Sequence, residues 1–166
     1  TATILIRNDH LKVWGIDEER LLSFAYENVQ RLIPPQLFLM REIVEETLEL
    51  GRRKPINLFE YPENLKGEFM YVLTNSHRNL GAAVILYPGV QKKIAEILRG
   101  SYYVIPSSIH EMIVIPTTES ITRKELDQMV KEVNENVVDP EEILSDHVYI
   151  YDAGKEVLQW VFSSRI

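Results

Sequence analysis

The sequence predicts an α+β fold, in which a mostly antiparallel sheet carries helices on one face. Apolar segments of strand length come in adjacent pairs with short links, whereas a parallel sheet needs a long crossover between strands. Segments with helical periodicity and capping residues separate these pairs. The 166 residues are 45% hydrophobic and 26% charged, which is typical of a globular domain and excludes a disordered chain.

Residues 1–50 are predicted to form a strand and a helical preface packed on the main body. The strand is expected at Thr3–Ile6. Asp17 is a good N-cap for a helix that the pair Pro34-Pro35 ends. A second helix is expected from about Leu39 to Leu50, with apolar and acidic side chains on opposite faces.

Residues 51–69 contain prolines and glycines without a clean period, and we expect a connecting loop there. The body, residues 70–166, is predicted to follow the order β-β-α-β-β-α-β-β, which a profilin-like or PAS-like sheet would fit. Its strands are expected at 70–73, 81–87, 102–105, 112–115, 148–151 and 157–162. Its helices are expected at 90–98, behind the capping box formed by Thr122 and Glu125, and, as a short helix, from the start motif Asp139-Pro140-Glu141-Glu142 to near Ser145.

The abrupt start of the chain indicates one compact domain cut from a longer protein. Charge and composition then limit the function. There are 18 Lys and Arg against 25 Asp and Glu, a net charge of −7, so a nucleic-acid partner is not expected. The chain has no cysteine, which excludes disulfides and thiolate catalysis and favours a cytoplasmic location. No apolar run approaches the roughly 20 residues that span a bilayer, so no membrane association is expected.

The densest group of polar side chains lies in a turn between two predicted strands, where a serine, a histidine and a glutamate stand close together. These residue types suggest a nucleophile, a base and an orienting carboxylate, but residues in one tight turn seldom reach triad geometry. The alternative is a turn whose hydroxyl groups bind backbone N–H groups. An Asp-His pair near the C-terminus could meet this turn across a sheet edge. The candidate catalytic residues are Ser107, Ser108, His110, Glu111, Asp146 and His147.

Binding of a metal or cofactor finds little support in the sequence. No two histidines have ligand spacing, and no glycine-rich phosphate loop is present, so we predict neither a metal nor a cofactor. A polar loop formed by Thr74, Asn75, His77 and Asn79 is a candidate ligand-binding segment. It fits a solvated hairpin connection equally well.

Six runs of sequence carry a resemblance to a known family. They are TATILI (1–6), HLKVWGI (10–16), MYVLTN (70–75), GAAVILYPGV (81–90), YVIPSSIHE (103–111) and LSDHVY (144–149). They resemble the DUF5688 family, uncharacterised proteins of gut-dwelling clostridial bacteria, and the chain looks like the C-terminal portion of a longer member. The resemblance implies a bacterial, cytoplasmic setting and gives no activity, cofactor or catalytic residue.

The sequence therefore favours a non-catalytic binding or protein-interaction module, because it contains no workable catalytic or metal motif. Two alternatives stay open. One is a hydrolase-like or metal-dependent enzyme that uses the turn of Ser107, His110 and Glu111 together with Asp146 and His147. The other is a dimerisation scaffold. The expected partner is an unidentified protein or small molecule, and an oligomer is possible.

Overall fold

The fold is described from a computed structural model. It covers residues 4–50, 54–65, 67, 69–117, 121–136 and 139–161. The chain divides into two compact units, Thr1–Pro34 and Pro35–Ile166. The sequence grouped residues 35–50 with the helical preface, whereas the structure groups them with the body.

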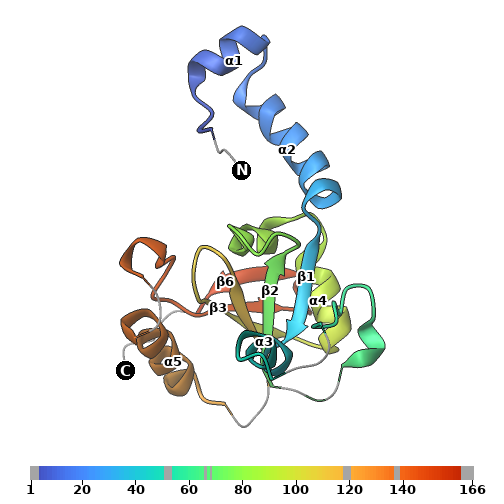
Figure 1. The fold of residues 1–166 in the computed structure, drawn as a ribbon, viewed down its shortest axis with the longest axis vertical. Helices are drawn as coiled ribbons and strands as arrows, with labels where there is room; N and C mark the ends of the chain where they lie inside the picture. Colours follow the sequence, from blue (N-terminus) through green and yellow to red (C-terminus); the bar gives the residue numbers. More distant parts are fainter. Residues whose placement is uncertain are drawn as a thin grey trace. The chain divides into compact units, whose positions relative to one another are not determined.

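The first unit is helical. It contains α1 (Asn8–Trp14) and α2 (Glu18–Leu32), coloured blue in Figure 1. The predicted cap is confirmed, because Oδ1 of Asp17 accepts a hydrogen bond from the backbone N–H of Arg20 at 2.8 Å. Neither helix buries a residue. The strand predicted at residues 3–6 is wrong for residues 4–6, which join none of the described strands, and Thr3 lies outside the described residues.

The second unit is built around a six-stranded sheet, counted over the described residues. Every pair of neighbouring strands is antiparallel, which confirms the predicted α+β class. The spatial order is β1-β2-β4-β3-β5-β6. The strands are β1 (Pro35–Leu39), β2 (Tyr71–Asn75), β3 (Tyr102–Pro106), β4 (Met112–Pro116), β5 (Tyr149–Asp152) and β6 (Val157–Trp160).

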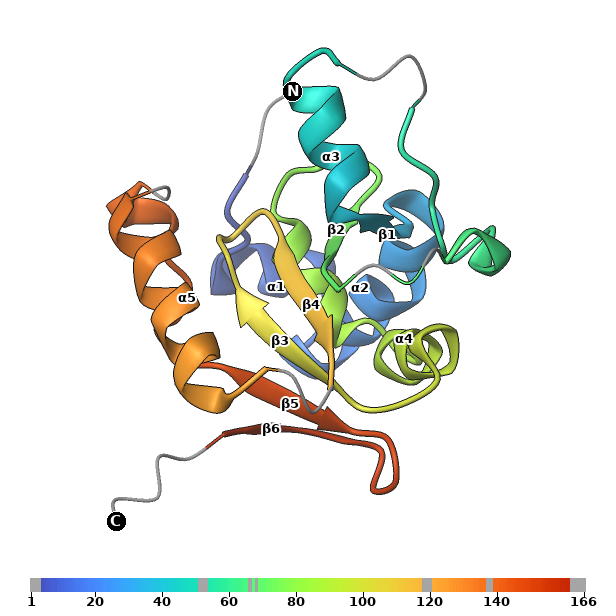
Figure 2. The same cartoon turned by 90° about the horizontal axis from the view of Figure 1, so that it is seen from below.

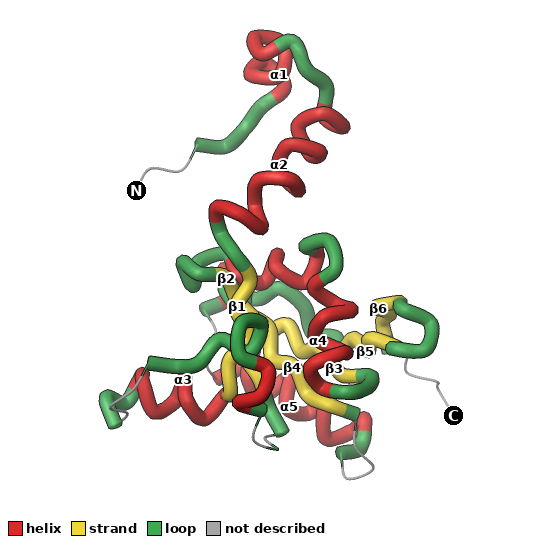
Figure 3. Tube along the Cα trace, turned by 90° about the vertical axis from the view of Figure 1, so that its right-hand side faces the viewer, coloured by secondary structure: helices red, strands yellow, loops and turns green. Residues whose placement is uncertain are grey.

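Helices cover both faces of this sheet, so the prediction of a single covered face is wrong. On one face, Ile105 and Ile113 form a core cluster with Leu126 of α5 (Arg123–Asn136). Successive residues of a strand point to opposite faces, and Tyr102 of β3 points to the other one. There its hydroxyl donates a hydrogen bond to the backbone carbonyl of Gln91, in α4 (Val90–Leu98), at 3.0 Å. Figures 2 and 3 show the strands between α4 and α5.

The strand predicted at 81–87 is also wrong, because this segment forms the 3₁₀ helix η2 (Gly81–Leu86). Its buried side chains follow a helical spacing, with Ala82 and Ile85 inside and Leu86 62% exposed. A short apolar run fits a strand or a buried helix equally well by periodicity. The neighbours of β2 are instead β1, in which Leu37 faces Leu73, and β4.

The outer edge of β1 is covered by the chain that follows α3 (Met40–Thr47). The backbone N–H of Leu58 donates to the carbonyl of Leu37 at 2.8 Å. Oδ1 of Asn57 accepts from the N–H of Leu37 at 3.1 Å. The described part of the predicted 51–69 loop, which includes η1 (Pro62–Asn64), therefore protects an edge strand that would otherwise expose its backbone groups.

The capping prediction for α5 is confirmed. The backbone N–H of Thr122 donates to Oε2 of Glu125 at 2.7 Å, and the N–H of Glu125 reaches the Thr122 hydroxyl at 3.4 Å. The helix expected after Asp139 is shorter than predicted, since η3 (Pro140–Glu142) is a single 3₁₀ turn.

Candidate functional site

His110 lies in the turn between β3 and β4 and joins two segments that are distant in sequence. Its Nδ1 accepts a hydrogen bond from the backbone N–H of Leu80 at 3.1 Å. Its Nε2 lies 3.2 Å from Oε1 of Glu142, at the end of η3. Since Nδ1 accepts, the proton of the neutral ring is on Nε2, where it is donated to Glu142.

The two serines do not form a nucleophile-base pair with this ring. Ser108 Oγ accepts from the backbone N–H of His110 at 3.0 Å, and the N–H of Ser108 donates to the carbonyl of Glu111 at 3.2 Å. Ser107 is buried, and among the described residues no hydrogen bond joins it to the ring. The arrangement is the hydroxyl-capped turn that the sequence offered as the alternative to a triad.

Glu111 is partly buried in the same turn. Loss of hydration raises the pKa of its carboxyl above the usual value, while His110 and Arg78 act in the opposite direction. Its carboxyl is not the one that contacts the imidazole of His110, because that place is taken by Glu142.

Asp146 and His147 have other neighbours. Oδ1 of Asp146 accepts from Nδ2 of Asn134, in α5, at 2.8 Å. The His147 ring packs on Trp160 of β6, with ring centroids 4.3 Å apart. The structure thus shows no shared contact between these two residues and His110, and within the described ranges no three His, Asp or Glu side chains gather as a metal site would require.

The candidate ligand-binding loop is held by its own hydrogen bonds. Nδ2 of Asn75 donates to the carbonyl of Asn79 at 2.8 Å, and its Oδ1 accepts from the N–H of His77 at 2.9 Å. The hydroxyl of Thr74 donates to the carbonyl of His110 at 2.9 Å. Thr74 and Asn75 are 2% and 4% exposed, so these two buried side chains support the segment that leads into η2.

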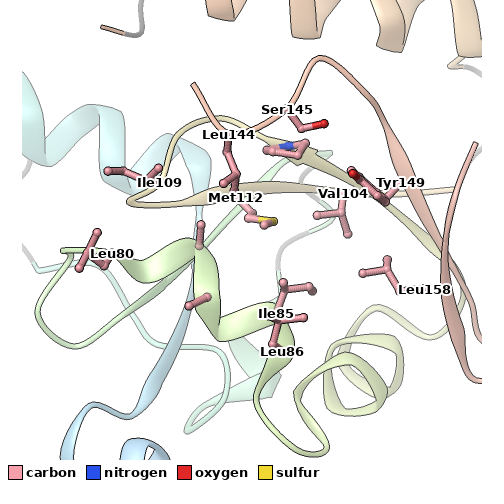
Figure 4. A pocket seen from close by; sticks show the side chains of 13 residues that line it. Leu80, Ile85, Leu86, Val104, Ile109, Met112, Leu144, Ser145, Tyr149 and Leu158 are labelled. Carbon is pink, nitrogen blue, oxygen red and sulfur yellow. The ribbon is translucent and has the colours of Figure 1, made fainter. Parts of the chain in front are cut away.

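Beside this loop lies a pocket of about 510 Å³. One wall is η2 with the residue before it. This wall contributes Leu80, Ala82, Ala83, Ile85 and Leu86. Figure 4 shows Ile85 and Leu86 on one side of the pocket.

The opposite wall comes from the sheet and two loops. The sheet residues belong to one face, since Val104 pairs with Tyr149 and Pro106 with Met112. This wall consists of Val104, Pro106, Ile109, Met112, Leu144, Ser145, Tyr149 and Leu158. Ser145 and Tyr149 provide the hydroxyl groups of the lining, and both lie on the side of the pocket away from Leu86 in Figure 4. No Asp, Glu, Lys, Arg or His is among the described residues that line the pocket.

The turn of His110 forms part of this pocket. Ile109 and Leu80 line it, and the backbone N–H of Ala82 donates to the carbonyl of Ile109 at 3.2 Å. Gly81 packs so closely on the Thr74 hydroxyl and the His110 carbonyl that a Cβ would collide with both. Sequence reasoning missed Glu142 and the apolar lining, because Glu142 stands in a helix-start motif and the lining is assembled from distant segments.

A second pocket, of about 590 Å³, lies between β1 and the 54–64 segment and is lined mainly by polar side chains. Several of them pair with one another. Nδ2 of Asn57 donates to Oε1 of Glu60 at 2.9 Å, and Arg78 forms an ion pair with Glu46.

Comparison with known proteins places the chain in a family but gives no activity. Over the part of the chain that the structure describes, no helix is both long and apolar enough to cross a bilayer. No curated protein and no solved structure is similar enough to count as a match, so the profilin-like or PAS-like comparison stays a prediction. A family model matches residues 1–153 of the 166. The chain belongs to DUF5688, a family of unknown function.

Proposed function

We propose that this protein is a non-catalytic binding module that takes a small, uncharged, largely apolar molecule into the pocket between η2 and the sheet. The observation that carries the proposal is the lining, in which all side chains except Ser145 and Tyr149 are hydrocarbon or thioether. The volume of about 510 Å³ falls within the range of small-molecule sites, roughly 300–1,000 Å³.

The chemistry of the lining defines the chemistry of the ligand. The free energy of an apolar body falls when it leaves water for such a surface. A charged group, in contrast, would lose its hydration without gaining a partner. The hydroxyl groups of Ser145 and Tyr149 can serve one hydrogen-bonding group at the end of the ligand. A molecule with an apolar body and one neutral polar end fits this distribution.

The hydrolase-like alternative is less well supported. A base needs a ring nitrogen that faces the nucleophile, and both ring nitrogens of His110 are bonded elsewhere, to Leu80 and Glu142. The dimerisation scaffold and the cytoplasmic location remain predictions.

Titration with N-phenyl-1-naphthylamine, an uncharged fluorescent probe, tests the proposed function. We expect saturable binding of one probe per chain. Ala83→Trp is expected to weaken it at least tenfold, because Ala83 lines the pocket and is solvent-exposed, so the indole fills space without disturbing the core.

Ala25→Trp is the matched control, since Ala25 is exposed on α2 in the other unit. It should bind the probe as wild type does, and circular dichroism should show that both variants are folded. Equal affinity of Ala83→Trp and wild type, or no saturable binding by wild type, would overturn the proposal.

A further inference from the structure

We propose that His110 is a positioning residue that holds the two walls of the apolar pocket together, and that protonation of its ring releases Leu80, at the start of the η2 wall, and weakens binding. The inference rests on the proposed function of this pocket. It assigns a regulatory role to a histidine that is not among the described residues lining the pocket.

The imidazole links both walls. Leu80, whose N–H donates to Nδ1 at 3.1 Å, directly precedes η2 and lines the pocket. Glu142, 3.2 Å from Nε2, comes two residues before Leu144, which lines the pocket from the other side. A single ring therefore connects the start of one wall with the start of the other.

The two bonds respond differently to a proton. Nδ1 can accept from Leu80 only while it is unprotonated. With a proton on Nδ1, the N–H of the ring and the N–H of Leu80 would face each other as two donors. The hydrogen bond between them would be lost. The contact between Nε2 and Glu142 would persist and become an ion pair, which is the stronger type of bond. Protonated His110 thus keeps Glu142 and gives up Leu80.

The rest of the turn limits the change to Leu80, because the N–H of Ala82, in η2, still donates to the carbonyl of Ile109 at 3.2 Å. The N–H of Ile109 donates to the carbonyl of Glu142 at 3.0 Å, and the hydroxyl of Thr74 donates to the carbonyl of His110 at 2.9 Å. Neither bond involves a group that gains or loses a proton between pH 7.5 and pH 5.5. They hold the turn in place while Leu80 is free to move.

Leu80 is well suited to move. It adopts a left-handed backbone conformation, with φ 52°, which is unfavourable for a residue with a side chain. Its side chain is 52% exposed, so a shift away from His110 exposes little buried surface. The hydrogen bond to Nδ1 is one of the contacts that keep Leu80 in this conformation.

Two carboxylates lie near the ring, and they come from different elements. Glu142 of η3 contacts the ring at Nε2, and Glu111 of the same turn interacts electrostatically with both His110 and Arg78, in the loop before η2. The side chains of His110 and Glu142 are 32% and 39% exposed, so protons reach the ring from solvent. Histidine side chains in general change charge between pH 5 and pH 8, and this range sets the two pH values of the test.

The test is the titration with N-phenyl-1-naphthylamine on the full chain at pH 7.5 and pH 5.5. We expect wild type to bind about threefold to tenfold more weakly at pH 5.5, because apparent affinity falls with the fraction of the binding-competent state. His110→Asn should bind equally at both pH values, since Oδ1 of asparagine stands where Nδ1 of histidine does and accepts the Leu80 N–H without titrating. His110→Leu, which has no acceptor, should bind weakly at both.

His147→Asn is the matched control, because His147 is exposed and packs on Trp160. It should retain the pH dependence of wild type. If wild type fails to bind at pH 7.5, the proposed function itself is wrong. If wild type binds at pH 7.5 but its affinity does not change at pH 5.5, or if His110→Asn shows the same loss as wild type, the role of His110 is wrong while the pocket stands.

Discussion

The apolar pocket beside η2 and the polar pocket beside β1 have similar volumes, about 510 and 590 Å³, and opposite chemistry. In the polar pocket, Asn57 and Glu60 bond to each other, and Arg78 pairs with Glu46. These side chains already use much of their bonding capacity to hold the 54–64 segment against β1. In the apolar pocket, Ser145 Oγ accepts from the N–H of His147 at 3.1 Å, and all lining side chains except Ser145 and Tyr149 are hydrocarbon or thioether. The difference teaches that volume alone does not identify a binding site.

The largest effect is expected in the polar pocket, on stability. Asn57 is buried, and its Oδ1 accepts from the N–H groups of Leu37 and Phe59 at 3.1 and 3.2 Å. Asn57→Ala leaves both donors without this partner and should lower the free energy of unfolding by about 2–3 kcal/mol. Urea denaturation measures the change.

Asn64→Ala serves as the control in the same pocket, because among the described residues its side chain makes one long bond, 3.4 Å, to the carbonyl of Tyr61. It should change the free energy of unfolding by less than about 0.5 kcal/mol. Equal losses for the two variants would contradict a specific structural role for Asn57.

A smaller effect is expected in the apolar pocket, on binding. Leu86 lines the pocket and is 62% exposed, so Leu86→Asp should fold normally. The carboxylate would have to lose water beside an apolar ligand, and we expect affinity for N-phenyl-1-naphthylamine to fall about tenfold, or 1.4 kcal/mol. Ser76→Asp, at an exposed position of the polar pocket, should leave probe affinity unchanged. If both variants lost affinity equally, the contrast between the pockets would fail.

The smallest effect concerns Glu111, in the turn that borders the apolar pocket. Burial raises the pKa of its carboxyl in the folded state. The folded state therefore keeps the proton of the Glu111 carboxyl to a higher pH than the unfolded state does. The free energy of unfolding falls as pH rises through the pKa that this carboxyl has in the folded state. Glu111→Gln removes this loss. The variant should exceed wild type in urea midpoint at neutral pH, with a difference that shrinks towards acidic pH; a difference that does not vary with pH would contradict this explanation.

Local signals accounted for the elements that the sequence predicted well. Asp17 bonds to a backbone N–H three residues away, and Thr122 and Glu125 cap α5 within one turn. Such bonds depend on a few neighbouring residues, so their sequence signature is sufficient. The strand pair at 102–105 and 112–115 was likewise predicted because its two members are adjacent in the chain.

The sequence by itself determined the α+β class, the caps and the absence of cysteine chemistry. Only the tertiary structure decided that residues 81–86 form a helix, because a short apolar run takes the conformation that its neighbours impose. It also decided that β2 pairs with β1 across 31 intervening residues. The same holds for His110, whose partners Leu80 and Glu142 lie 30 and 32 residues away. Contacts of this kind depend on how the whole chain packs, and no local pattern specifies them.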